Sequence, residues 1–185
     1  MAWQKGAKLY RPGSSEPFKV SRSKIDLFRE CPRCFYLDRR LGVSRPSMPG
    51  FSLNSAVDHL LKKEFDALRK SGKPHEIMKR YGVDAVPFVH KDLDVWRENF
   101  VGKQVLHGQT NFIVFGAVDD LWVNPQGELI VVDYKSTSTD KEISLEDQWK
   151  VAYKKQLETY QWLFRESGFA VSNQAYIVYL SLIHI

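Results

Sequence analysis

Residues 116–135 read Gly116-Ala-Val-Asp-Asp-Leu-Trp-Val-Asn-Pro-Gln-Gly-Glu-Leu-Ile-Val-Val-Asp-Tyr-Lys135, which is two apolar runs around a turn. The turn sequence starts with Asn124 and ends with Gly127, with Pro125 in its second position. These residue types are typical of a type I turn followed by a left-handed glycine, which closes a three-residue hairpin loop. We therefore predict a β-hairpin whose loop consists of residues 125–127.

The loop length sets which residues of the two strands face each other. A three-residue loop pairs Asn124 with Glu128 and, further back, Asp119 with Asp133. Because side chains alternate along a strand, Lys135 lies on the same face as Asp133. A two-residue loop would bring Asp120 to that face instead, so Asp120 is the alternative to Asp119.

A cluster of Asp119, Asp133 and Lys135 has a chemical use. Two adjacent carboxylates repel each other unless a cation lies between them, and hard oxygen ligands suit Mg²⁺ or Mn²⁺. The simpler interpretation is an exposed hairpin with an ordinary Asp–Lys pair across the strands. However, residues 129–134 are apolar on both faces, which is typical of a covered strand, where charged groups need partners. This favours a functional site.

The same residues resemble a known family. The order Gly-x-x-Asp, hairpin, Asp-Tyr-Lys is similar to the PD-(D/E)xK nuclease superfamily in its RecB-like branch. Three further segments follow the pattern of that branch in the same order. They are residues 21–36, which resemble an opening helix that ends in Cys-Pro and aromatic residues, a helix carrying His59, and Gln156-Leu-Glu-Thr-Tyr160.

The resemblance implies a metal-dependent deoxyribonuclease that acts in DNA repair, recombination or phage/CRISPR-type DNA processing. By resemblance, one or two Mg²⁺ (or Mn²⁺) ions are held by His59, Asp119, Asp133 and the carbonyl of Tyr134. His59 lies away from the apolar stripe of its helix, which without the resemblance would indicate a solvated surface residue. Ser55 stands four residues before His59, where the branch usually has glycine.

The resemblance also implies the remaining catalytic groups. Lys135 orients or deprotonates the attacking water, while Gln156 and Tyr160 border the active site. Residues 156 and 160 are one helical turn apart and share a face. An aromatic core stripe is the simpler interpretation of that face, although a buried glutamine in it requires hydrogen-bond partners.

Composition agrees with a DNA partner without requiring one. The 185 residues include 27 Lys and Arg against 22 Asp and Glu, a formal net charge of +5. A basic excess of this kind favours binding to polyanions, and a helicase or recombination protein is a further expected partner.

No apolar run approaches about 18 residues, so we expect no membrane span. The N-terminal residues lack the apolar core of a signal peptide, and the chain has two cysteines, so we expect a cytoplasmic protein.

Cys31 and Cys34 form a single Cys-x-x-Cys, which lacks the second ligand pair of a structural zinc site. Part of the RecB-like branch holds an iron–sulfur cluster, with one cysteine near this position and three beyond the Gln-x-x-x-Tyr helix. No cysteine follows Cys34 up to Ile185, so we expect two core thiols and no cluster within these residues, while ligands beyond Ile185 stay open. Two other functions remain open: a catalytically inactive DNA-binding subunit of the same fold, and a small metal-binding interaction module built on these cysteines.

Eight basic residues are candidates, as a group, for contacts along the phosphates of a bound DNA strand: Arg33, Arg39, Arg40, Arg45, Lys141, Lys150, Lys154 and Lys155.

The predicted fold is α/β, with a central mixed sheet of about four strands flanked by helices. Residues 1–20 are expected to form an N-terminal arm and residues 21–185 one nuclease-like domain, whose final apolar strand reads as truncated. Helices are expected at residues 21–31, 52–71 and 148–166, with further helix at 73–107 that is broken at Pro74, Gly82 and Pro87. Strands are expected at residues 109–123, 128–135 and 175–182.

Overall fold

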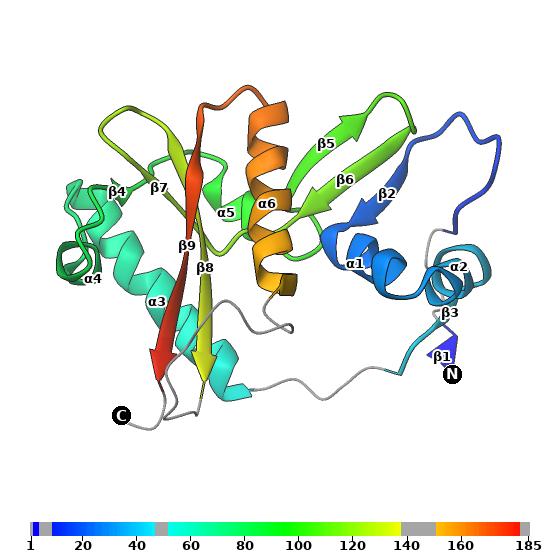
Figure 1. Ribbon diagram of the computed structural model, residues 1–185, viewed down its shortest axis with the longest axis horizontal. Coiled ribbons are helices and arrows are strands. Elements are labelled where there is room, and N and C mark those ends of the chain that lie inside the picture. Colours follow the sequence, from blue (N-terminus) through cyan, green and yellow to red (C-terminus); the bar gives the residue numbers. More distant parts are fainter. Residues whose placement is uncertain (1, 4–8, 47–51, 138–150, 182–185) are drawn as a thin grey trace. The chain divides into compact units, whose positions relative to one another are not determined.

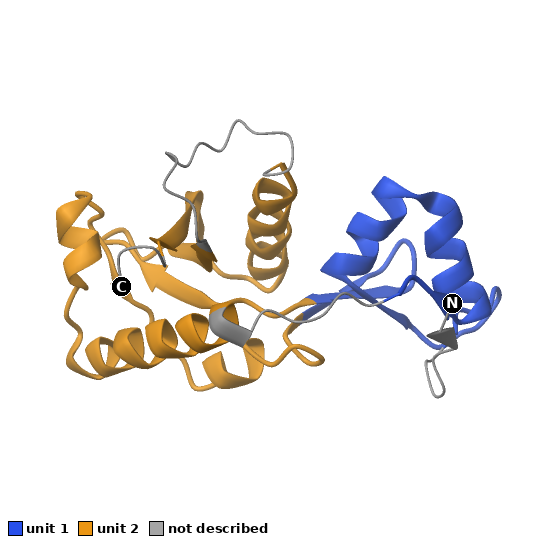
Figure 2. Ribbon diagram, turned by 90° about the horizontal axis from the view of Figure 1, so that it is seen from below, with its two compact units in different colours: residues 1–50, 104–115 blue, residues 51–103, 116–185 orange. Residues whose placement is uncertain are grey.

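The protein is described by a computed structural model, in which residues 2–3, 9–46, 52–137 and 151–181 are placed. Figure 1 shows its helices and strands. The predicted α/β class is confirmed, with mixed sheets of three and four strands flanked by helices. The chain divides into two compact units (Figure 2): unit 1 comprises Met1–Gly50 and Gln104–Phe115, and unit 2 comprises Phe51–Lys103 and Gly116–Ile185.

Unit 2 is built on the four-stranded sheet, in the order β4-β7-β8-β9. Its strands are β4 (Val86–Pro87), β7 (Asp120–Val123), β8 (Leu129–Thr137) and β9 (Val171–Ser181). β7 pairs antiparallel with both β4 and β8, whereas β8 and β9 are parallel. The central strand β8 is therefore paired on both edges, as its apolar sequence predicts.

Two helices cover the two faces of this sheet (Figure 2). α3 (Ser52–Ser71) occupies the range that its apolar periodicity predicts. Its residues Val57, Leu61 and Phe65 pack in one core cluster with Trp122 and Val132 of the sheet. α6 (Val151–Glu166) connects β8 to β9 and contacts both strands. Residues 148–150 of the helix expected there lie outside the described residues.

The region expected as broken helix at residues 73–107 is helical only in part. The structure has three short elements there, α4 (Glu76–Arg80), α5 (Leu93–Trp96) and β5 (Lys103–His107), in addition to β4. The chain turns at Gly82, whose φ is +62°, and at Gly102, whose φ is +58°. Because Met78 and Trp96 are each buried, tertiary packing rather than helix propensity holds these elements in place.

Unit 1 contains two small sheets. One pairs β1 (Ala2–Trp3) with β3 (Val43–Ser44), and the other has the order β2-β6-β5. β2 (Phe18–Ser21) and β6 (Phe112–Gly116) are parallel. The strand expected at 109–123 is therefore two strands, β6 and β7, which belong to different sheets. The segment expected as an N-terminal arm contributes β1 and β2 to unit 1.

Two consecutive helices complete unit 1. α1 (Arg22–Glu30) ends before Pro32, as the sequence predicts. α2 (Pro32–Leu41) was not expected, and it follows at once with Pro32 in its first turn and Gly42 in the left-handed conformation at its end. None of the helices among the described residues has the length and apolar character that crossing a membrane requires.

Gly102 generates a prediction about stability. Its φ is +58°, and a Cβ atom added there would lie 2.4 Å from the carbonyl oxygen of Gly116. Gly102→Ala should therefore lower the free energy of unfolding by at least about 2 kcal/mol, since backbone strain and a backbone clash add. Urea denaturation measures the loss. Gly108→Ala is the matched control, because space around Gly108 is open; equal effects of the two substitutions would contradict the prediction.

Candidate active site

The β7–β8 hairpin has the predicted loop and register. Gly127 is left-handed, with φ +79°, and its N–H donates to the Asn124 carbonyl at 3.0 Å. Val123 pairs with Leu129 and Asp120 with Val132. The three-residue loop is thus confirmed. Continuing this register by one residue sets Asp119, just before β7, opposite Asp133.

Asp119 lies where the chain enters β7. Its Oδ2 accepts a hydrogen bond from the Tyr134 N–H at 3.0 Å, so the neighbouring strand fixes the carboxylate. Its Oδ1 is 3.1 Å from Nζ of Lys62, a residue of α3. With 23% of its side chain exposed, Asp119 is available to a ligand.

Asp133 is the buried member of the pair, with an exposed fraction of 1%. Its Oδ1 accepts a hydrogen bond from Gln156 Nε2 at 2.8 Å, and its Oδ2 forms an ion pair with Lys135. Burial raises the pKa of Asp133 to about 6, because the Lys135 ammonium offsets only part of the effect and the Asp119 carboxylate adds to it. The two carboxylates therefore interact as the register predicts.

Gln156 and Tyr160 come to this site from α6. Gln156 Nε2, which bonds Asp133, also donates to the Tyr160 hydroxyl at 3.3 Å. Tyr160 is buried, so its hydroxyl gives the Gln156 side chain a fixed hydrogen-bond partner. Lys135 Nζ lies 5.2 Å from the ring centre of Tyr153, one helical turn before Gln156. The structure thus brings together Asp119, Asp133, Lys135, Gln156 and Tyr160.

Asp120, the alternative to Asp119, occupies a different environment. It is fully buried, and its Oδ1 forms ion pairs with Arg69 at 2.5 Å and Arg97 at 2.9 Å. The Tyr134 hydroxyl donates to its Oδ2 at 2.7 Å. Burial and the Asp120 carboxylate together hold the pKa of Tyr134 well above its usual value. The surroundings of Asp120 are those of a structural group.

A cavity of about 470 Å³ opens beside Asp119 and Lys135. Ser55 and Asp58 of α3 line it, and Lys62 of the same helix forms an ion pair with Asp58 at 2.8 Å. Burial lowers the pKa of Lys62, but Asp119 and Asp58 outweigh burial and hold the pKa above its usual value. Sequence reasoning missed both Asp58 and Lys62, although their i,i+4 spacing is typical of a helical ion pair.

His59 is not brought to this cavity. It is exposed on α3 and is absent from the residues that line the cavity, where its neighbour Asp58 is found. Tyr134 lines it, and its carbonyl oxygen accepts a hydrogen bond from Lys135 Nζ at 3.3 Å. No group of three or more His, Cys, Asp and Glu side chains in the described part of the chain has the spacing of a metal site.

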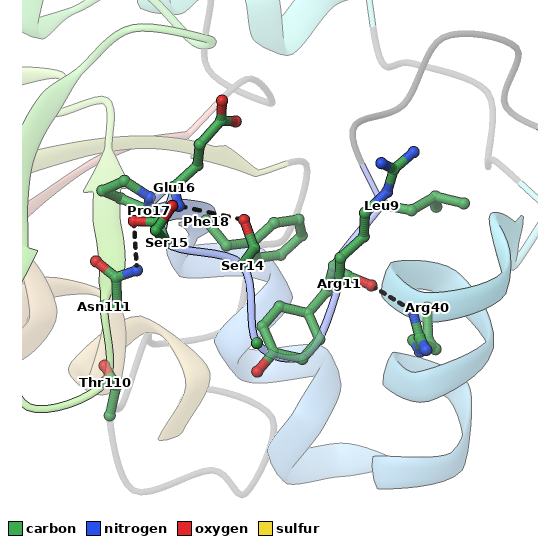
Figure 3. A pocket seen from close by; sticks show the side chains of 12 residues that line it. Leu9, Arg11, Ser14, Ser15, Glu16, Pro17, Phe18, Arg40, Thr110 and Asn111 are labelled. Carbon is green, nitrogen blue, oxygen red and sulfur yellow. Dashed lines mark hydrogen bonds between the residues drawn. The ribbon is translucent and has the colours of Figure 1, made fainter.

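A larger cavity, of about 820 Å³, lies within unit 1 and has different chemistry (Figure 3). The segment from Leu9 to Phe18 forms much of its wall, and among the described residues Glu16 is the only carboxylate that lines it. Asn111 donates to the Ser15 carbonyl at 3.2 Å and Arg40 to the Tyr10 carbonyl at 2.8 Å, so both brace the segment. With a single carboxylate, this cavity lacks the paired oxygen ligands found beside Lys135.

The two cysteines lie in unit 1 as free thiols. Cys31 caps α2, and its sulfur accepts a hydrogen bond from the Cys34 N–H at 3.1 Å. Hydrogen bonds from Cys34, with the nearby Arg45, lower the pKa of Cys31. Cys31 and Cys34 are each partly exposed rather than deeply buried in a core.

The expected phosphate path is divided between the units. Arg39 pairs with Asp38, Arg45 pairs with Glu30, and Arg40 bonds a backbone carbonyl. Lys141 and Lys150 lie outside the described residues. Arg33, in contrast, is exposed and forms no ion pair with a described residue.

A comparison with protein families is consistent with this geometry. The family model of the PD-(D/E)XK nuclease superfamily matches residues 52–184, which include the hairpin, α3 and α6. No curated protein matches the chain.

The contrast between Asp119 and Asp120 generates a prediction. Asp120→Asn should lower the free energy of unfolding by about 2–3 kcal/mol, because it removes the buried carboxylate that pairs with Arg69 and Arg97 and leaves them only Asp66, which is 40% exposed. Asp119→Asn should cost about 1 kcal/mol or less, since the side chain is partly exposed and retains an acceptor oxygen. Urea denaturation of the two variants side by side tests this. Equal losses would show that Asp120 does not hold the fold.

The pKa of Asp133 generates a second prediction, for metal-free protein. Because its folded-state pKa lies above the unfolded value of about 3.9, this carboxyl contributes stability that is complete below about pH 4. That stability is lost as the pH rises through about 6. Relative to Asp133→Asn, the wild type should lose about 3 kcal/mol between pH 4 and pH 8. A stability difference that does not change with pH would contradict the raised pKa.

Proposed function

Because the chain belongs to the PD-(D/E)XK nuclease superfamily, we propose that it is a metal-dependent deoxyribonuclease of the RecB-like branch. The observation that carries the proposal is the grouping of Asp119, Asp133 and Lys135 on one hairpin. Gln156 bonds the more buried of the two carboxylates. These groups suit metal-dependent hydrolysis of a phosphodiester, since they provide oxygen ligands for a divalent cation and an ammonium beside the attacking water.

The residues present fit a hard divalent cation. Oδ2 of Asp133 is buried and accepts no hydrogen bond from the described residues, although the Lys135 ammonium forms an ion pair with it. Asp119 adds a second carboxylate that raises the pKa of Asp133. A cation between the two would remove this repulsion. The ligands we propose are Asp119, Asp133 and the carbonyl of Tyr134. His59, the further ligand that the resemblance implies, is exposed on α3 and does not line the cavity, so the proposal does not depend on it.

Each residue has a separate task in this proposal. When bound, Mg²⁺ or Mn²⁺ supplies a water of lowered pKa and neutralises charge on the phosphate. Lys135 Nζ holds the attacking water and takes or shares its proton. Gln156 keeps one oxygen of Asp133 turned toward α6, so that the other points to the cation. Tyr160 keeps Gln156 in that orientation.

The compartment and pathway also belong to the proposal. The free thiols of Cys31 and Cys34 suit a reducing cytoplasm. We propose DNA repair, recombination or phage/CRISPR-type DNA processing as the setting, with a helicase or recombination protein as a partner. These assignments rest on the resemblance of the motifs to the RecB-like branch.

Removing the lysine tests the reaction directly. Lys135→Ala should reduce cleavage of labelled DNA by at least about a thousandfold, because positioning of the water is lost. DNA affinity should remain within a few-fold, since it depends on many phosphate contacts. Gel assays with Mg²⁺ and anisotropy with chelator measure the two effects.

The controls separate the alternatives. Lys73→Ala removes an exposed lysine of unit 2 and should leave cleavage unchanged. Wild-type cleavage should disappear with chelator and return with Mg²⁺ or Mn²⁺. Normal cleavage by Lys135→Ala would show that the site is wrongly assigned. DNA binding by the wild type without cleavage under any of these metals would identify a catalytically inactive DNA-binding subunit.

A further inference from the structure

The positive charge of the chain is concentrated in unit 1. This unit carries 11 Lys and Arg residues against 4 Asp and Glu, a net charge of +7. Unit 2 carries 16 against 18, a net charge of −2. The excess of +5 in the whole chain therefore comes entirely from unit 1. Residues 1–50 lie outside the family match over residues 52–184, so the match does not explain this charge.

Most charged groups of α1 and α2 already neutralise one another. Lys24 pairs with Asp38 at 2.6 Å and Arg22 with Asp26 at 2.6 Å. Arg45, which follows α2, pairs with Glu30 at 2.9 Å. Three cations of these helices have no such acidic partner among the described residues. Arg40 is partly buried and donates to the Tyr10 carbonyl, whereas Arg29 and Arg33 are exposed.

Two exposed aromatic rings lie in the same short segment. Phe28 is 50% exposed and Tyr36 is 57% exposed. Phe28 packs edge-on against Phe35 at 5.3 Å, which supports its ring from beneath. Tyr36 follows Arg33 by three positions in α2, so the two are neighbours on the helix surface. We call Phe28, Arg29, Arg33 and Tyr36 the α1–α2 corner.

Two arginines without an acidic partner among the described residues, with an exposed ring on either side of them in the sequence, suit one kind of ligand. Single-stranded nucleic acid presents phosphates to cations and unstacked bases to aromatic side chains, and proteins that bind it combine these two contacts. We propose that the α1–α2 corner binds single-stranded DNA, with Arg29 and Arg33 on phosphates and Phe28 and Tyr36 stacked on bases. The inference rests on the proposed function, since it names the part of the chain that holds the substrate strand.

The chemistry argues against a duplex as the ligand. The bases of a duplex are stacked on one another, so the rings of Phe28 and Tyr36 would have no partner there. An acidic protein surface would pair with the arginines but offers no array of flat π faces. A contribution of the Phe28 and Tyr36 rings to the binding affinity therefore distinguishes a single strand from a duplex or an acidic protein surface as the ligand.

The test is fluorescence anisotropy with labelled oligothymidylate in chelator, where nothing is cut. Arg29→Gln/Arg33→Gln should reduce the slope of log affinity against log salt by about 1.4, because each phosphate contact on a single strand contributes about 0.7. Tyr36→Ala should weaken binding at least about fivefold while leaving the slope unchanged, because it removes stacking rather than charge. Phe28→Leu, which keeps an apolar side chain against Phe35, should do the same.

The matched charge control is Lys73→Gln/Arg80→Gln, two exposed cations of unit 2, which should leave the slope unchanged. A control that reduces the slope as much as the corner variant would overturn the inference. So would tighter binding of a duplex, or full affinity in both ring variants.

The nuclease proposal can fail separately. A wild type that binds the single strand through the corner but never cuts contradicts the nuclease and supports the corner. A wild type that cuts, with corner variants that bind as tightly as the wild type, overturns the corner alone.

Discussion

The rest of the site depends on the buried ion pairs of Asp120 with Arg69 and Arg97. One carboxylate with no exposure bonds both guanidinium groups, so α3 and the segment after α5 are tied to the first residue of β7. Arg97 also donates from Nε to the Asp119 carbonyl at 3.0 Å. The two adjacent aspartates therefore have different roles. Asp120, which is buried, fixes the backbone, and Asp119, which is partly exposed, lines the cavity. Removing one partner of a buried ion pair destabilises a fold by more than the pair contributes to its stability, because the remaining charge stays buried. The ion pairs of Asp120 therefore specify the geometry of the site more than they add to the free energy of unfolding.

Local chemistry explains which parts of the fold could be predicted. The turn residues from Asn124 to Gly127 have one preferred backbone path, and from that path the pairing of Asp119 with Asp133 follows by counting. α3 was predicted because its apolar residues repeat at helical spacing over 20 positions. α2 was missed because Pro32 was taken only as the end of a helix. Proline is equally favourable in the first turn of the next helix, where the structure places it.

Long-range packing determines the features that could not be predicted from the sequence. Residues 73–107 form elements of five residues or fewer, and periodicity over so short a range cannot distinguish them from one broken helix. Likewise, nothing in an apolar run reveals that β6 and β7 join different sheets. On α3, neighbouring positions point about 100° apart, so Asp58 and His59 cannot both face the cavity directly. The resemblance implied His59, whereas Asp58 lines the cavity in the structure. Which of them lines the cavity depends on how the helix packs against β8, and local sequence does not encode that.

The division of the chain into units has a consequence for any shortened form of the protein. Unit 1 takes its β2 strand from residues 18–21 and β6, which lies at the centre of that sheet, from residues 112–116. A fragment limited to the family-matched residues would retain β6 but lose the parallel strand beside it. Its backbone N–H and C=O groups would then form an open strand edge, which readily pairs with other chains. Residues 18–21, which lie outside the match, thus cover an edge of β6 that would otherwise be open.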